Sequence, residues 1–177
     1  MSNIKLGIIG SGQLGSLLCQ AAKKFNIRTV VISDDKQGPA QNYSDEFIFT
    51  EYTNKDKMKE FIRKVDIVTY EFENIPVEIL KDIDKEKRVI PKPEINQTIQ
   101  NRKLEKKFIN DLGIKTTEWA FIKSFEDIEK NKNLLPGILK TNTLGYDGHG
   151  QFVLNSLADI KKDWRFSADY ILEKKVN

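Results

Sequence analysis

The chain has 177 residues, of which 39% are apolar and 31% charged, and this is typical of a soluble globular chain with one domain, or one and part of another. The 29 basic and 26 acidic residues are interspersed and leave a net charge of +3, so we expect no nucleic-acid partner. We find no apolar run of membrane-spanning length and no signal peptide, so we expect no membrane partner and a cytoplasmic location. A single cysteine (Cys19) and a single histidine exclude an internal disulfide and metal sites built from clusters of these residues.

Over the first 93 residues, short apolar runs alternate with stretches of helical periodicity. The predicted strands are 4–9, 29–32, 46–49, 66–70 and 88–90. Helices are predicted from about residue 14, from the capping residue Asn54 through Arg63, and from Pro76 to Asp84. Such regular alternation predicts an α/β fold with a parallel sheet.

The first strand runs into a glycine loop, Gly-Ser-Gly-Gln-Leu-Gly, at residues 10–15. Leu14, Leu17 and Leu18 then recur at helical spacing, and Asp34 follows the second strand. A GxGxxG loop between strand and helix, with an acidic residue about 20 positions on, is the dinucleotide fingerprint, so an NAD-dependent oxidoreductase is one hypothesis.

The fourth predicted strand ends in the acidic sequence Glu71-Phe72-Glu73. Ligands of open α/β sheets bind outside the carboxyl ends of the strands, so these two carboxylates are candidate ligand contacts. A solvated acidic turn is the alternative interpretation.

Pro91 and Pro93 mark the boundary to a second part of the chain, which we place at residues 94–177. A long charged helix is predicted over 94–112 and ends before Gly113. Residues 113–177 then predict a small α+β lobe with strands at 118–122, 138–141, 152–154 and 170–173, and helices at 125–130 and 157–164.

Within this lobe, Lys140 follows a short apolar run, and Gly145, Gly148 and Gly150 come shortly after it. Closely spaced glycines let the main chain approach a ligand and offer its N–H groups to an anion, while Lys140 supplies a positive charge for phosphate oxygens. An ordinary glycine-rich hairpin is the alternative.

The string Lys140…Gly145-Tyr146-Asp147-Gly148-x-Gly150-Gln151 resembles the lysine and loop of ATP-grasp enzymes, and most of all the N5-carboxyaminoimidazole ribonucleotide synthetases. Four further segments carry the same resemblance over the whole chain: Gly-Gln-Leu-Gly at 12–15, Glu-Phe-Glu at 71–73, Asn-Arg-x-x-x-Lys at 101–106 and Glu-Lys-Lys-Val at 173–176.

The resemblance implies a Rossmann-like pre-ATP-grasp domain at residues 1–93, then a linking helix and the small lobe of an ATP-grasp domain at 94–177. It implies a carbon–nitrogen ligase of purine biosynthesis that uses ATP, Mg²⁺ and bicarbonate. Carboxyphosphate would form first, and its carbon dioxide would pass to the amine of 5-aminoimidazole ribonucleotide. Another ATP-grasp carboxylase or ligase would share the lysine, the loop and the hinge segment.

The same resemblance implies site residues. The expected ATP contacts are Arg102, Lys140, Gly145, Tyr146, Asp147, Gly148, His149, Gly150, Gln151, Glu173, Lys174, Lys175 and Val176. The expected contacts of the ribonucleotide are Gln13, Glu71, Glu73, Tyr146, Asp147 and His149. Lys106 is implied as a structural or phosphate-side neighbour.

Two departures from the family pattern limit these expectations. His149 stands where the family usually has Arg or Lys, and with an ordinary pKa of roughly 6.5 it is only partly charged near neutrality. The family's acidic metal ligands and ribonucleotide-phosphate residues lie in a C-terminal half that this sequence lacks. We therefore assign no catalytic or metal-binding residue here and expect residues 1–177 alone to be inactive as a synthetase. Family members are commonly homodimers.

Overall fold

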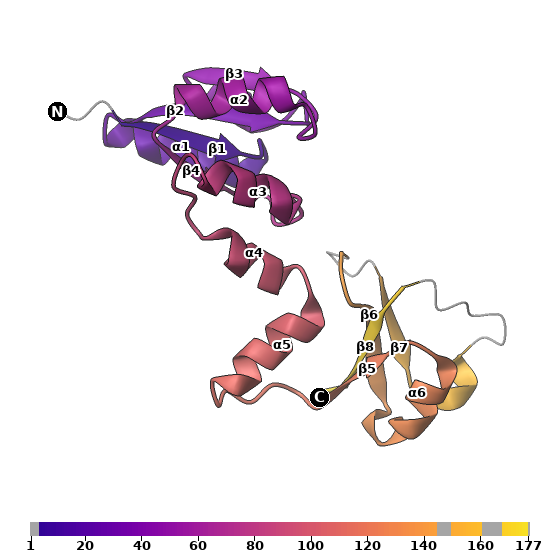
Figure 1. Cartoon of the computed structure of the whole chain (residues 1–177). Coiled ribbons are helices and arrows are strands. Elements are labelled where there is room, and N and C mark those ends of the chain that lie inside the picture. The colour runs from indigo at the N-terminus through magenta and orange to yellow at the C-terminus, as the bar shows by residue number, and fades with distance from the viewer. Residues whose placement is uncertain (1–3, 145–149, 161–167, 177) are drawn as a thin grey trace. The chain divides into compact units, whose positions relative to one another are not determined.

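The computed structural model describes residues 4–144, 150–160 and 168–176. The chain forms two compact units, residues 1–97 and 98–177, each with its own sheet (Figure 1). The sequence places the boundary a few residues earlier, between 93 and 94. Within the described ranges, every helix is too short or too polar to span a bilayer.

The first unit is built on a four-stranded parallel sheet. Its strands are β1 (Lys5–Ile9), β2 (Arg28–Ser33), β3 (Glu46–Phe49) and β4 (Ile67–Tyr70), in the order β3-β2-β1-β4. All four match predicted strands, and the predicted α/β fold with a parallel sheet is confirmed. Because the strands are parallel, the carboxyl ends of β1, β2 and β4 meet at one edge, where ligands of such sheets bind.

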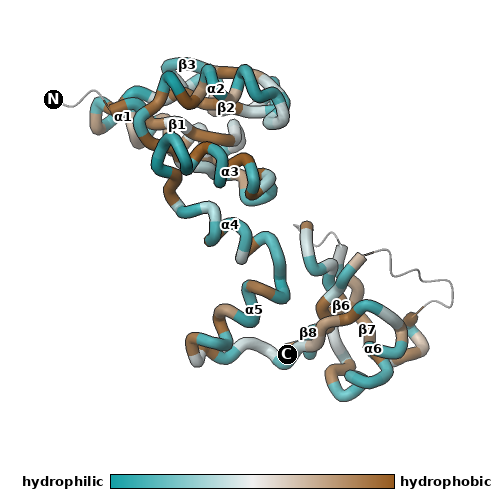
Figure 2. The backbone as a smooth tube through the Cα atoms, viewed as in Figure 1, coloured by the Kyte–Doolittle hydropathy of each residue, from teal (hydrophilic) through white to brown (hydrophobic). Residues whose placement is uncertain are grey.

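Helices α1 (Gln13–Lys24), α2 (Lys55–Lys64) and α3 (Val77–Asp84), with the short 3₁₀ helix η1 (Pro39–Asn42), cover this sheet. One apolar cluster joins the sheet to α2 and α3, with Phe61 and Leu80 fully buried, and a second joins it to α1 and η1 through Cys19 and Ala40. Figure 2 shows the corresponding apolar stretches along β1 and β2. The sheet is therefore buried on both faces, as a parallel sheet requires.

The predicted strand at 88–90 is wrong as a full strand, because only an isolated bridge between Val68 and Val89 forms there. Val68 donates to Arg88 O and Ile90 donates back to Val68 O, both at 2.9 Å. Pro91 follows at once and has no N–H, so the ladder cannot continue.

The predicted continuous helix over 94–112 is also wrong. The structure has two helices, α4 (Pro93–Ile99) and α5 (Arg102–Asp111), with Asn101 extended between them at φ −124° and ψ 106°. The Asn101 side chain accepts a hydrogen bond from Leu104 N at 3.1 Å, so this residue caps α5 rather than continuing α4.

The second unit contains a four-stranded antiparallel sheet in the order β5-β8-β6-β7. Its strands are β5 (Trp119–Ile122), β6 (Gly137–Thr141), β7 (Gln151–Leu154) and β8 (Tyr170–Lys174). Helix α6 (Phe125–Lys130) and the 3₁₀ helix η2 (Lys132–Leu134) follow β5, and Ile128 and Leu139 lie in the shared core. Of the predicted helix over 157–164, residues 161–164 lie outside the described residues, and the described part forms a 3₁₀ turn, η3 (Leu157–Asp159).

Candidate functional site

Lys140 lies near the end of β6, which pairs with β7 in antiparallel fashion. Lys140 pairs with Gln151 in the antiparallel register, and Thr141 N donates to Gly150 O at 3.0 Å. Gly150 has φ +70°, and an added Cβ would lie 2.7 Å from Thr141 Oγ1, so glycine is required at this position. The predicted contacts Gly145, Tyr146, Asp147, Gly148 and His149 fall outside the described residues.

Arg102 ties helix α5 to the start of this loop. Its Nη1 donates to Thr141 O at 2.7 Å and to Leu144 O at 2.6 Å. The side chain of Asn142, which is 5% exposed, accepts from Lys103 N, while Arg102 N donates to Asn142 O at 2.8 Å. The first turn of α5 is thereby fixed next to the loop that follows Lys140.

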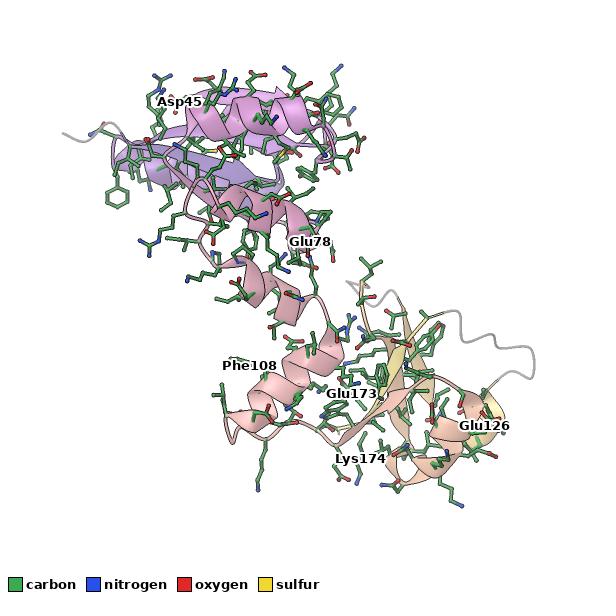
Figure 3. The ribbon with its side chains drawn as sticks, in the orientation of Figure 1. Asp45, Glu78, Phe108, Glu126, Glu173 and Lys174 are labelled. Carbon is green, nitrogen blue, oxygen red and sulfur yellow. The ribbon has the colours of Figure 1, made fainter. Side chains whose placement is uncertain are left out.

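A buried cluster of three charged residues joins Lys140 to Glu173 and Lys106. The Glu173 carboxylate accepts from Lys140 Nζ at 2.7 Å and lies 3.1 Å from Lys106 Nζ. The three side chains are only 11% (Glu173), 14% (Lys106) and 21% (Lys140) exposed. Figure 3 shows Glu173 and its neighbour Lys174 on β8. Two ammonium groups share one carboxylate, so this cluster carries a net positive charge.

The ionised form of Glu173 is stabilised despite its burial. Burial acts to raise the pKa of this carboxyl, but the hydrogen bonds and charges of Lys140 and Lys106 outweigh it and lower the pKa below its ordinary value. Lys106 was implied as a structural or phosphate-side neighbour, and the structure places it on the same carboxylate as Lys140.

Two backbone N–H groups of the segment after Glu173 are used in hydrogen bonds within the second unit. Lys174 N donates to Glu118 O and Lys175 N donates to Pro136 O, each at 2.9 Å. Val176, which is 74% exposed, completes the predicted hinge at the end of β8.

In the first unit, the side chain of Glu71 occupies the glycine loop. Gly12 N donates to Glu71 Oε1 at 2.7 Å. A Cβ added at Gly10 would lie 2.8 Å from that oxygen, and one added at Gly12 would lie 3.0 Å from it. The loop that holds a pyrophosphate in dinucleotide-binding folds therefore surrounds the Glu71 carboxylate here.

The acidic residue of the fingerprint also has an internal neighbour. Tyr52 is 8% exposed, and its pKa is raised to about 12, first by burial and then by the charge of nearby Asp34. Because Glu71 and Tyr52 meet the two groups that would bind NAD, the geometry disfavours the oxidoreductase hypothesis.

Two of the other predicted ribonucleotide contacts, Gln13 and Glu73, lie at the same edge of this sheet, while Tyr146, Asp147 and His149 fall outside the described residues. Gln13 is exposed at the first position of α1, and Glu73 is exposed after β4. Glu71 is half-buried and accepts a hydrogen bond from Gly12 N, so it also shapes the glycine loop. The sequence pattern did not predict this second role. Among the described residues, no group of three histidine, cysteine or acidic side chains is arranged to hold a metal ion.

Two family models match the chain in succession. Residues 3–100 match the family described as the ribonucleotide synthetase preATP-grasp domain, and residues 107–177 match the ATP-grasp domain. The N5-carboxyaminoimidazole ribonucleotide synthase of Brucella melitensis biotype 1 is 35% identical over 165 residues, which are 92% of this chain and 46% of that protein.

Solved structures agree with these matches. A crystal structure of an ADP complex of N5-carboxyaminoimidazole ribonucleotide synthetase has a TM-score of 0.91 and 33% identity, over 99% of this chain and 48% of that one. The Aspergillus clavatus synthase in complex with ADP and 5-aminoimidazole ribonucleotide has a TM-score of 0.82 and 25% identity, over 99% and 47%.

The chain spans about half the length of these relatives. Its two units follow the order of the two matched domains, and the predicted Rossmann-like and ATP-grasp architecture is confirmed. The chain belongs to the ribonucleotide synthetase family that carries a preATP-grasp domain followed by an ATP-grasp domain.

Proposed function

We propose that this chain supplies the preATP-grasp domain and the first nucleotide-binding lobe of an N5-carboxyaminoimidazole ribonucleotide synthetase. The observation that carries the proposal is the cluster of Lys140, Lys106 and Glu173, in which two lysines share one carboxylate beside a glycine-containing hairpin. Excess positive charge on rigid strand and helix positions suits the phosphates of ATP.

In this proposal Lys140 and Lys106 bind phosphate oxygens, and Glu173 holds both ammonium groups in place until the nucleotide arrives. Arg102 fixes the start of the loop through the carbonyl oxygens of Thr141 and Leu144. The N–H groups of Lys174 and Lys175 are used by the sheet, so we assign contact with the base to the exposed Val176 end of this segment.

The reaction proposed is ATP-dependent carboxylation in purine biosynthesis. A bicarbonate oxygen attacks the γ-phosphorus, ADP leaves, and carboxyphosphate forms. Its breakdown to phosphate supplies carbon dioxide to the exocyclic amine of 5-aminoimidazole ribonucleotide, which loses a proton. The lysines' charge offsets the charge on the transferring phosphoryl group. Mg²⁺ belongs to the same proposal as ATP and bicarbonate.

Contacts with the ribonucleotide are proposed for Gln13, Glu71, Glu73, Tyr146, Asp147 and His149. The structure of the Aspergillus clavatus relative with 5-aminoimidazole ribonucleotide supports a small-molecule substrate of this class. A cytoplasmic homodimer belongs to the same proposal.

The nucleotide site is tested by calorimetric titration of ADP into residues 1–177. Lys140→Ala and Lys106→Ala should each weaken ADP binding roughly tenfold or more, because each removes a charge-assisted contact. Lys107→Ala is the matched control, since Lys107 is 64% exposed and pairs with Asp111 on the same helix. Equal affinity in all three variants would contradict the proposed site.

The substrate is tested by ADP release from a version of the chain extended with the coding sequence that follows residue 177. Release in bicarbonate and Mg²⁺ should depend strongly on added 5-aminoimidazole ribonucleotide. ADP release that does not depend on this compound would be consistent with an ATP-grasp enzyme but would mean that its substrate is a different compound.

A further inference from the structure

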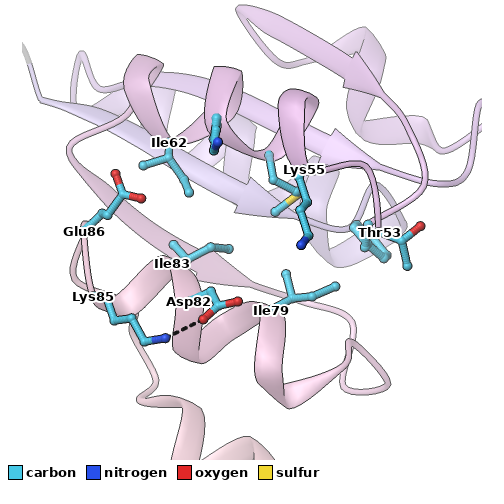
Figure 4. Close-up of a pocket in the computed structure, with 11 residues that line it drawn as sticks. Thr53, Lys55, Ile62, Ile79, Asp82, Ile83, Lys85 and Glu86 are labelled. Carbon is cyan, nitrogen blue, oxygen red and sulfur yellow. Dashed lines mark hydrogen bonds and ion pairs between the residues drawn. The ribbon is translucent and has the colours of Figure 1, made fainter.

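Helices α2 and α3 border a hollow of about 520 Å³ that lies wholly within the first unit. Figure 4 shows Ile62 and Lys55 from α2 opposite Ile79 and Ile83 from α3. Its volume lies within the range of pockets that bind small organic molecules. The predicted ATP and ribonucleotide contacts are not among the residues that line it.

The floor of the hollow is apolar and rigid. Met58, Ile62 and Ile83 are at most 7% exposed and belong to the core cluster of this unit, and Ile79 packs against that cluster. The floor side chains are therefore held in place by the core, so a ligand's apolar body would meet a preformed surface.

The rim has an uneven charge. Three lysines and two acidic residues line the hollow, and Lys85 pairs with Asp82 at 2.6 Å. The charge of Lys55 on α2 also acts on Asp82, and Lys59 and Glu86 complete the charged rim. Lys55 and Thr53 lie at one end of the hollow and Glu86 at the other (Figure 4).

We propose that this hollow binds a small organic anion with an apolar body, such as a medium-chain carboxylate. The apolar part would lie on Met58, Ile62, Ile79 and Ile83, and the carboxylate would lie at the Lys55 end, within reach of Lys59. The net charge of the lining, one positive, complements a monoanion, and the acidic Glu86 end favours one orientation of the ligand.

The test is titration of decanoate into ¹⁵N-labelled protein, followed by amide NMR. Saturable shifts should be confined to α2, α3 and the residues around Tyr52. The double variant Lys55→Gln/Lys59→Gln, at exposed positions, should weaken binding roughly three- to tenfold. Decanol should bind more weakly than decanoate and should be insensitive to this double variant.

The matched control is Lys57→Gln/Lys81→Gln, which removes the same amount of charge, one lysine from α2 and one from α3, outside the hollow. Its affinity should stay within about twofold of the starting protein. Ile79→Glu should abolish the shifts by placing a carboxylate on the floor.

The proposal would be overturned by shifts elsewhere, by no shifts, or by equal weakening in both double variants. It would also be overturned if light scattering showed a dimer that Ile79→Glu dissociates, because a second copy would then occupy the hollow. These results are independent of ADP binding, since both helices lie in the first unit and Lys140 lies in the second.

Discussion

Lys140 and Glu173 lie on neighbouring antiparallel strands, in diagonal positions on the same face of the sheet. Lys140 is opposite Ile171 and Ile138 is opposite Glu173, so the two charged side chains are offset by two residues along the strands and meet at 2.7 Å. Lys106 reaches the second carboxylate oxygen from α5. One buried carboxylate thus links two strands and a helix of the second unit.

Glu173→Gln should destabilise the second unit by about 3 kcal/mol, because two partly buried ammonium groups lose the charge that they share. Urea unfolding followed by tryptophan fluorescence measures this, since both tryptophans of the sequence, Trp119 and Trp164, belong to residues 98–177.

The control is Glu118→Gln, which breaks the pair of Glu118 with Lys174 beside the same strand. These side chains are 63% and 47% exposed, so the loss should be less than about 0.5 kcal/mol. Similar losses in both variants would show that burial of Glu173 adds nothing to the strength of its ion pairs.

The contribution of Glu173 to stability should also depend on pH. Its folded pKa lies below the ordinary value of 4.5, so the unfolded chain takes up a proton there before the folded chain does. The contribution is therefore complete above pH 4.5 and is lost as the pH falls from there through the folded pKa.

The measurement is the difference in unfolding free energy between the original protein and Glu173→Gln, from neutral pH to about pH 3. The difference should be constant near neutrality and should shrink below pH 4.5, since a protonated Glu173 resembles glutamine. A difference that does not change with pH would contradict the lowered pKa.

The strands and helices were largely predictable because their patterns are local. The predicted bounds 46–49 and 125–130 are those of β3 and α6, and the alternation of strands and helices indicated the parallel sheet. The strand at 88–90 was overestimated because the effect of Pro91 on the ladder was not weighed. The break at Asn101 was missed although asparagine is a preferred capping residue.

The packing of α1 shows what periodicity misses. The pattern gave a helix with Leu14, Leu17 and Leu18 at helical spacing, but these side chains are 59%, 52% and 36% exposed. The buried face carries small residues such as Gly15, where a Cβ would lie 3.0 Å from Gly10 O. The helix approaches the loop closely, so only small residues fit on its buried face. A hydropathy scale does not detect a buried face built from small residues.

The sequence indicated residues for the candidate site but not how their side chains pair. The resemblance indicated Lys140, Glu173 and Lys106, and the structure adds that one carboxylate joins all three. Glu71 was expected to face the ribonucleotide, yet it bonds to Gly12, 59 residues earlier. The adjacency of β1 and β4 makes this contact, and strand order is not a local property of the sequence.

Cys19 should react at least roughly a hundredfold more slowly with Ellman's reagent in the folded protein than in urea. The thiol is 1% exposed between β1, β2 and η1, and its pKa is raised, first by burial and also by the charge of Asp45. The rate of absorbance change after addition of the reagent measures this. Rapid stoichiometric labelling in native buffer would contradict the buried position.

Because Cys19 belongs to the first unit, the urea dependence of its labelling also reports the free energy of unfolding of that unit. This measurement tests the effect of substituting Gly10. Gly10→Ala should destabilise the first unit by about 2–3 kcal/mol. Gly10 has φ +101°, and the added Cβ would lie 2.8 Å from Glu71 Oε1, so backbone strain and displacement of Glu71 from Gly12 N both contribute.

Gly113→Ala separates the two contributions. Gly113 has φ +77°, but an added Cβ has nothing within 4 Å, so this variant reports backbone strain alone, about 1 kcal/mol in the second unit by tryptophan fluorescence. The excess cost at Gly10 measures the fit of Glu71 in the loop. Equal costs at Gly10 and Gly113 would mean that the loop accommodates a side chain beside Glu71, so that Glu71 does not fill the anion position of the GxGxxG loop.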